Sequence, residues 1–235
     1  MAPARRRRGC RGEPGRRAGP AVSRAHPKNP RSPRSELTLP EECVPGYSGP
    51  LWRIHAVVGP YRMAWDELRW HGPLRRSRWD PQPGPLAERS SVGVSYTAPA
   101  PTTCFAEVFQ DDRAITLTSD LALSGWVPSR ELALLDLTGG SGSGDWAVQN
   151  GASASLAQAP RGTCRAWAQA IHEQLGEQID GLLAPSTVLG DPIIVLFARA
   201  ADAFPAGPSF SRTLEQADVL TLAVRVRDRL GWPIR

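Results

Sequence analysis

Several signals that would place a chain in a common class are missing from this one. No run approaches the roughly 18 apolar residues of a transmembrane helix, and no continuous apolar segment follows the basic N-terminus, as a secretory signal requires. The four cysteines form no C-x-x-C pair, and the four histidines have no partner at metal-ligand spacing. These gaps argue against a zinc site and a disulfide framework. We therefore expect a cytoplasmic protein with reduced thiols, no bound metal and no membrane association.

Two common catalytic motifs are also missing. The glycine-rich run at 139–144 lacks the Lys-Ser/Thr that completes a P-loop, and no G-x-G-x-x-G stands at a strand-to-helix junction. There is no G-x-S-x-G with a paired His and Asp pattern, which argues against a serine hydrolase. We interpret residues 139–144 as a flexible linker.

The positive charge is concentrated at the N-terminus. Residues 1–35 carry eleven basic side chains against Glu13 alone, a net of +10, so the remaining 200 residues have a net of −5 within the total of +5. The N-terminal segment is rich in Arg, Pro, Gly and Ala, and it cannot bury enough apolar surface to offset the entropy of ordering. We predict a disordered basic tail over residues 1–40. It is either an arm for nucleic acid or an acidic partner, or a dispensable extension.

The rest of the chain has the composition of one enzyme-sized domain, which we place at residues 48–230. Hydrophobic residues make up 41% of the 235 positions, and no internal repeat is found. Patterning predicts strands at 51–58, 92–98, 113–118, 131–137, 179–183, 193–198 and 219–226, and helices at 61–70, 104–109, 152–157 and 161–176. Strands and helices that follow no regular βαβ alternation favour the α+β class, with a compact mixed sheet and flanking helices.

Four side chains between 51 and 109 have the types that a nucleotide site needs: Arg53, Arg78, Tyr96 and Glu107. A guanidinium matches phosphate oxygens and stays charged at any accessible pH. Arg53 lies in an apolar strand-like run, so it needs an anionic partner, either a bound pyrophosphate or Glu107 in a structural ion pair. Glu107 has apolar neighbours, so it is either paired or functional. The set suits a site that binds a phosphorylated nucleoside and breaks a glycosidic bond.

The motifs around these residues resemble the RES domain family, named for an arginine, a glutamate and a serine. They are Leu51-Trp52-Arg53, Ser77-Arg78-Trp79-Asp80-Pro81, Val94-Ser95-Tyr96-Thr97-Ala98, Thr103-Cys104-Phe105-Ala106-Glu107-Val108, Leu134-Leu135-Asp136-Leu137-Thr138, Pro160-Arg161-Gly162-Thr163-Cys164-Arg165-Ala166-Trp167-Ala168, Asp180-Gly181-Leu182-Leu183-Ala184-Pro185-Ser186 and Ile194-Val195-Leu196-Phe197. No single motif establishes the resemblance, but the order of the motifs along the chain is fairly specific.

The resemblance implies an ADP-ribosyltransferase-like fold and an enzyme that degrades NAD, as a glycohydrolase or a phosphorylase. NAD would be the substrate and not a cofactor, and the acceptor would be water or inorganic phosphate. Many members are bacterial toxins neutralised by an Xre-type helix-turn-helix antitoxin, and self-association is common. Carried over by position, the resemblance makes Arg53, Glu107 and Ser186 catalytic, with Arg53, Arg78, Tyr96 and Ser186 binding the substrate.

Two other functions remain open from the sequence. A catalytically degenerate RES domain would bind a nucleotide or a partner without turnover. A nucleic-acid binder driven by the basic tail would lose affinity steeply with added salt.

Overall fold

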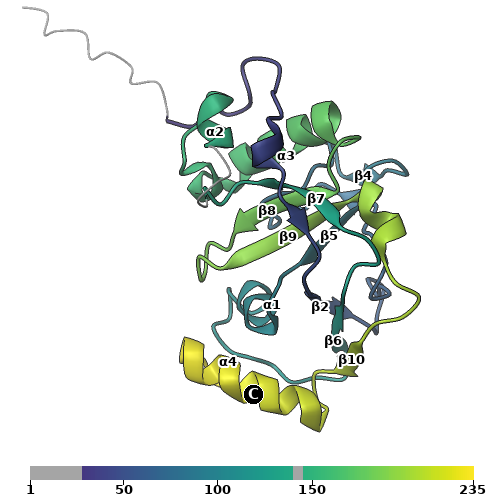
Figure 1. Ribbon diagram of the computed structural model, residues 1–235. Helices are drawn as coiled ribbons and strands as arrows, with labels where there is room; N and C mark the ends of the chain where they lie inside the picture. Colours follow the sequence, from purple (N-terminus) through teal and green to yellow (C-terminus); the bar gives the residue numbers. More distant parts are fainter. Residues whose placement is uncertain (1–27, 140–144) are drawn as a thin grey trace, which may run out of the picture.

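The computed structural model describes residues 28–139 and 145–235 (Figure 1). Its strands are β1 (Gly46–Tyr47), β2 (Leu51–Ala56), β3 (His71–Gly72), β4 (Ala87–Glu88), β5 (Val94–Thr97), β6 (Leu121–Trp126), β7 (Leu132–Asp136), β8 (Gly181–Pro185), β9 (Pro192–Phe197) and β10 (Phe210–Thr213). Its helices are α1 (Pro101–Val108), α2 (Trp146–Gln149), α3 (Arg161–Leu175) and α4 (Ala217–Leu230), with short 3-10 turns at Glu41–Cys43, Leu156–Gln158 and Ala198–Ala203. The α+β prediction is confirmed.

Two sheets form the centre of the molecule. The larger has the order β1-β7-β8-β9-β5 and is mixed, because β7 and β8 are parallel while its other pairs are antiparallel. Parallel neighbours need a long crossover, and the chain between β7 and β8 contains α2 and α3. The smaller sheet, β10-β6-β2, is antiparallel. The two sheets are joined by the bridge between Trp52 and Ala98.

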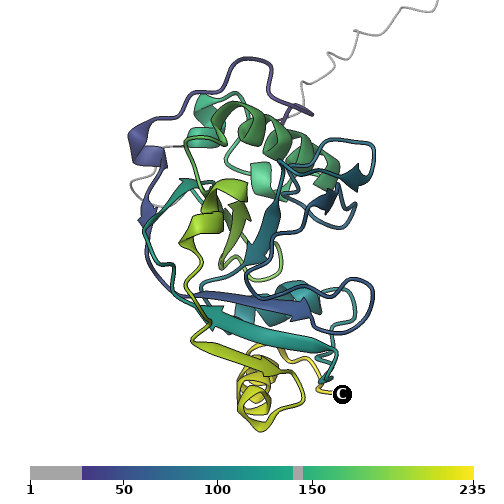
Figure 2. The same cartoon turned by 90° about the vertical axis from the view of Figure 1, so that its right-hand side faces the viewer.

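The elements stack in layers, which Figure 2 shows from top to bottom as α3, the larger sheet, the smaller sheet and α4. Strand β9 lies inside this stack and is apolar on both faces. Ile193, Val195 and Phe197 pack toward α3, while Ile194 and Leu196 pack between the two sheets. A strand covered on both sides reads as an unbroken apolar run, which explains why the sequence located it well.

A third apolar cluster lies between α1, α4 and the smaller sheet, and it overturns one prediction. Residues 219–226 are predicted as a strand because they form a short apolar run of strand length, but they belong to α4, whose Val219, Ala223 and Val226 are buried. Their spacing of four and three residues is helical. Gly231, with a positive φ of 68°, ends the helix as a left-handed cap.

Other predicted elements also differ from the structure. The 61–70 segment forms turns and not a helix, and 113–118 is extended only where Ile115 bridges Ile234 near the C-terminus. The helix predicted at 104–109 begins earlier, with Pro101 in its first turn and Ala100 as its cap. Proline suits a first helical turn because its missing N–H is not needed there. The 152–157 helix is reduced to a 3-10 turn at Leu156–Gln158.

The N-terminal segment is more ordered than predicted. Residues 28–40 were assigned to a disordered tail, but the Trp167 indole N–H donates to the Pro30 carbonyl at 3.0 Å, and the Trp146 indole donates to the Thr38 carbonyl at 2.8 Å. Leu37 is buried in the same apolar cluster as both tryptophans. A few apolar and backbone contacts therefore order this segment despite its composition, whereas residues 1–27 and the linker predicted at 139–144, apart from Gly139, lie outside the described residues.

A charged network fixes the start of β8. Asp180 is fully buried, accepts two hydrogen bonds from Arg130 at 2.8 and 2.9 Å, and accepts a third from Arg199 at 2.7 Å. Burial alone would raise the pKa of the Asp180 carboxyl, but the hydrogen bonds from Arg130 and from the Ala133 backbone N–H, with the nearby arginine charges, lower that pKa on balance. The network ties β8 to the β6–β7 turn and to the turn after β9.

We expect the free energy of unfolding to fall as the pH drops below about 4, because the unfolded Asp180, with an ordinary pKa near 3.9, takes up a proton before the folded one does. The Asp180→Asn variant should lose about 3 kcal/mol at neutral pH, since it leaves two arginines without their buried partner. Urea denaturation at several pH values measures both effects. The control is Asp202→Asn. The Asp202 side chain also pairs with Arg130 but is 70% exposed, so this variant should lose little free energy of unfolding. An Asp180→Asn variant as stable as the wild type would show that the Asp180 network does not stabilise the fold.

Candidate active site

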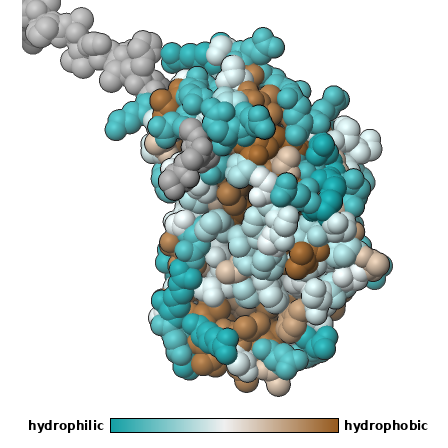
Figure 3. Space-filling view, in the orientation of Figure 1, coloured by the Kyte–Doolittle hydropathy of each residue, from teal (hydrophilic) through white to brown (hydrophobic). Residues whose placement is uncertain are grey.

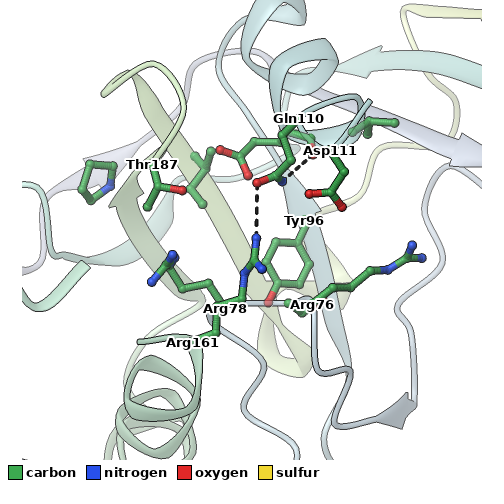
Figure 4. Close-up of a pocket in the computed structure, with 12 residues that line it drawn as sticks. Arg76, Arg78, Tyr96, Gln110, Asp111, Arg161 and Thr187 are labelled. Atoms are coloured by element: carbon green, nitrogen blue, oxygen red, sulfur yellow. Dashed lines mark hydrogen bonds between the residues drawn. The ribbon is translucent and has the colours of Figure 1, made fainter. Parts of the chain in front are cut away.

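A cavity of about 320 Å³ opens where the β3–β4 loop, α1, the start of α3 and the β8–β9 loop meet. Its lining combines polar and apolar surface in nearly equal parts and carries both signs of charge. In Figure 4 the arginines lie along its lower side and Gln110 and Asp111 along its upper side. The lining residues are Arg76, Ser77, Arg78, Tyr96, Glu107, Val108, Gln110, Asp111, Arg161, Pro185, Thr187 and Ile193. We call this cavity the main cleft.

Glu107 is the half-buried carboxylate of the main cleft, and Ser186 holds it. Helix α1 buries Phe105 and Ala106 against α4, which leaves Glu107 facing the cleft. The Ser186 hydroxyl donates to Glu107 Oε1 at 2.5 Å. A short charge-assisted hydrogen bond of this kind fixes the carboxylate in one orientation.

Ser186 is itself positioned by the loop between β8 and β9. Its hydroxyl oxygen accepts hydrogen bonds from the backbone N–H groups of Val188 at 3.1 Å and Leu189 at 3.2 Å, and its own N–H donates to the Asp191 carbonyl at 2.8 Å. With its oxygen accepting twice, the hydroxyl has its proton free to donate to Glu107. Two residues that are 79 positions apart in the sequence, Ser186 and Glu107, are thus in direct contact at the main cleft.

Three arginines supply the positive charge of the main cleft. Arg78 is half-buried and anchored, because its Nη1 donates to the Ala159 carbonyl at 2.5 Å and lies 3.5 Å from the Cys164 sulfur. The guanidinium has further N–H groups on Nη2 and Nε. Arg76 and Arg161 are exposed, and Arg161 reaches Gln110 Oε1 at 3.4 Å. An anchored cation beside two adaptable ones suits an extended anionic ligand such as a pyrophosphate.

Tyr96 forms part of the wall of the main cleft (Figure 4). Burial raises the pKa of its phenol well above the ordinary value, so the ring is neutral under all working conditions. Its hydroxyl makes no hydrogen bond of good geometry with the described residues. Tyr96 therefore contributes an apolar face at this point of the cleft.

The structure does not bring Arg53 into the main cleft. Its side chain is buried on the other side of β2, where Nη1 donates to the carbonyls of Ala64, Trp65 and Glu67, the last at 2.6 Å. Burial lowers the pKa of Arg53 to about 10, which leaves it charged at neutral pH. Three backbone carbonyls therefore take the place of the anionic partner that the sequence predicts for Arg53. These contacts also occupy carbonyl groups in the segment that was predicted to be helical.

Sequence reasoning missed five polar residues of the main cleft: Arg76, Gln110, Asp111, Arg161 and Thr187. Arg76 and Arg161 lie beside or within the quoted motifs, so their charge was a usable signal. Gln110 and Asp111 lie just after α1, and only knowledge of where that helix ends places them at the cleft.

Among the described residues, no group of three or more His, Cys, Asp or Glu side chains could hold a metal ion. No helix in the same part of the chain is long and apolar enough to cross a membrane.

These features define an α+β protein with a cleft that is lined by three arginines and built around one oriented carboxylate. The model of the RES domain matches residues 50–215, most of the chain, so this protein belongs to the RES domain family. No curated protein matches the sequence. Among solved structures, the chain is similar to the crystal structure of the M. tuberculosis MbcT–MbcA toxin–antitoxin complex, with 19% identity, a TM-score of 0.48, and coverage of 78% of this chain and 93% of that one.

We expect Arg53→Met to lower the free energy of unfolding by about 3 kcal/mol, because it removes three hydrogen bonds from a buried charged donor to the carbonyls of the 64–67 turn. Urea denaturation measures the loss. Arg62→Met, at an exposed arginine nearby, is the control and should change stability by less than about 0.5 kcal/mol. If both variants are equally stable, the Arg53 contacts do not hold the 63–67 segment.

Proposed function

We propose that the main cleft binds NAD and that the protein cleaves the bond between nicotinamide and its ribose, with water or inorganic phosphate as the acceptor. Membership of the RES domain family supports the reaction class. The observation that carries the proposal is Glu107, a carboxylate oriented by Ser186 in a cleft that also holds three arginines. In this proposal the arginines bind the pyrophosphate and Glu107 acts at the ribose.

The chemistry needs one well-placed negative charge. As the bond from ribose C1′ to the nicotinamide nitrogen breaks, the ring nitrogen keeps both electrons and nicotinamide leaves as a neutral molecule. The ribose passes through an oxocarbenium-like transition state, which an oriented carboxylate stabilises electrostatically. An oxygen of water or phosphate then bonds to C1′, and water would release its extra proton to Glu107 or to solvent. The products are nicotinamide and either ADP-ribose or its 1″-phosphate.

Ser186 has a positioning role in this scheme. Its hydroxyl donates to one carboxylate oxygen of Glu107, so the other oxygen is available to the ribose. Arg78, held by the Ala159 carbonyl, would bind the pyrophosphate with little loss of side-chain entropy, since it is already ordered. Tyr96 would pack against the ribose or the nicotinamide. Arg53 would support the fold and not contact the substrate.

The first test is release of nicotinamide from NAD by the purified protein, with and without phosphate, followed by product mass. Glu107→Gln keeps the size of the side chain and removes its charge, so it should lower the rate at least about 100-fold, as expected for loss of one electrostatic group. Asp112→Asn, at an exposed acid that does not line the cleft, is the control and should retain activity. Wild-type protein that binds NAD without releasing nicotinamide would favour the degenerate domain. Release that survives Glu107→Gln would remove Glu107 from the mechanism.

We further propose that the protein acts as the toxin of a toxin–antitoxin pair with a helix-turn-helix partner, as members of its family do. Controlled expression in bacteria should deplete cellular NAD and stop growth, because the reaction consumes a central metabolite. Expression of Glu107→Gln at the same level should leave NAD and growth unchanged. Growth arrest by both proteins, with NAD intact, would contradict this role.

A further inference from the structure

Helix α4 lies outside the residues that match the RES domain, yet it supports the helix that carries Glu107. The match ends at residue 215, just before α4 begins. In Figure 1 the helix lies directly below α1. Its buried side chains share an apolar cluster with Phe105 and Ala106, the two residues that precede Glu107 on α1. The position of Glu107 therefore depends on α4.

The loop that carries Ser186 is a closed turn between β8 and β9. The Ser186 N–H donates to the Asp191 carbonyl at 2.8 Å, and the Gly190 N–H donates to the Ser186 carbonyl at 2.9 Å. Gly190 has a positive φ of 78°, which glycine adopts without strain. Asp191 thus lies opposite Ser186 at the base of the loop. A restraint on Asp191 acts on Ser186 through one backbone hydrogen bond.

An ion pair connects this loop to α4. Arg229, in the last turn of α4, donates from Nη2 to Asp191 Oδ2 at 2.7 Å. The two side chains are 49% and 33% exposed, and neither residue is among those that line the main cleft. Figure 3 shows hydrophilic and hydrophobic residues side by side at the lower end of the molecule, where α4 lies. A pair this exposed contributes little to the free energy of unfolding, so its effect is on the position of the loop.

Apolar contacts hold the same loop against the same part of the protein. Val188 and Leu189 are partly buried and pack against the apolar cluster that α1 and α4 share. Their backbone N–H groups donate to the Ser186 hydroxyl oxygen at 3.1 and 3.2 Å. The ion pair and the apolar contacts therefore act on one short segment, and the amides of that segment orient the Ser186 hydroxyl.

We infer that α4 sets the position of Ser186 relative to Glu107, and that Arg229 is a positioning residue for the proposed reaction. The helix supports Glu107 through the apolar cluster and Ser186 through the ion pair with Asp191, so both partners of the 2.5 Å hydrogen bond depend on one helix. In an active site, a displacement of about 1 Å that begins far from the reacting atoms can lower the rate up to about 100-fold. The inference rests on the proposed function and adds to it a residue outside the family match.

The kinetic test compares kcat and KM for NAD in purified variants of the full chain. Arg229→Met removes the charge and should lower kcat about fivefold, as expected for loss of one partly exposed ion pair. KM should not change, because the arginines proposed to bind the pyrophosphate stay in place. Arg229→Lys can still reach Asp191 and should recover most of the wild-type kcat. Asp191→Asn should match Arg229→Met, and the double variant should lose no more than either one.

The matched control is Arg227→Met. Arg227 lies in the same last turn of α4 and is 48% exposed, but its partner is the neighbouring Asp228. This variant should keep the wild-type kcat. The Tm of Arg229→Met should lie within about 3 °C of the wild-type Tm, so a loss of kcat reports on the loop and not on unfolding. An Arg229→Met variant with wild-type kcat, or an equal loss of kcat in Arg227→Met, would overturn the inference.

Amide hydrogen exchange tests the same restraint without turnover. The N–H groups of Ser186, Val188, Leu189 and Gly190 should exchange faster in Arg229→Met than in the wild type or Arg227→Met, because the loop opens more often without its ion pair. Equal exchange in all three proteins would overturn the inference. A wild type that does not cleave NAD would instead overturn the proposed function, while faster exchange in Arg229→Met would still show that α4 positions Ser186.

Discussion

The hydrogen bond from Ser186 to Glu107 links, at the cleft, the two layers of the protein that the Trp52–Ala98 bridge also joins. Glu107 belongs to a helix that packs against α4 and the smaller sheet, whereas Ser186 follows a strand of the larger sheet. The cleft lies at the boundary between these two parts, where polar side chains remain accessible. Its geometry therefore depends on both halves being folded, and any slip of α1 relative to β8 would separate the carboxylate from the serine.

The sequence identified most of the larger sheet because its strands are covered on both faces and appear as unbroken apolar runs. It failed where two signals competed. In α4, a short apolar run has the length of a strand, whereas the spacing of Val219, Ala223 and Val226 and the capping glycine at 231 indicate a helix. Strand β6 and strand β10 were missed, since Ser and Gly interrupt the apolar pattern of Leu121–Trp126 and Phe210–Thr213 is short and only half-buried.

The candidate site was predicted in part, and the error concerns the arginines. Residue type alone cannot distinguish a guanidinium that binds a ligand from one that binds backbone carbonyls, because both need several acceptors. Arg53 lies within a strand that is buried on alternate residues, and its acceptors come from a turn eleven to fourteen residues away. Arg78 lies on a loop at the cleft. The order of the motifs pointed to Glu107, Tyr96 and Ser186. Which of the two arginines lines the cleft and which binds backbone carbonyls depends on the tertiary fold.

The contacts of residues 28–43 have a consequence for where this protein can be divided. The part that matches the RES domain begins at residue 50 and ends at residue 215, yet Leu37 and Cys43 complete the core against α3, and α4 completes the core against α1. A cut at the boundaries of the family match would expose the faces of both outer layers to water. The segment that folds cooperatively is therefore longer at each end than the segment that matches the RES domain.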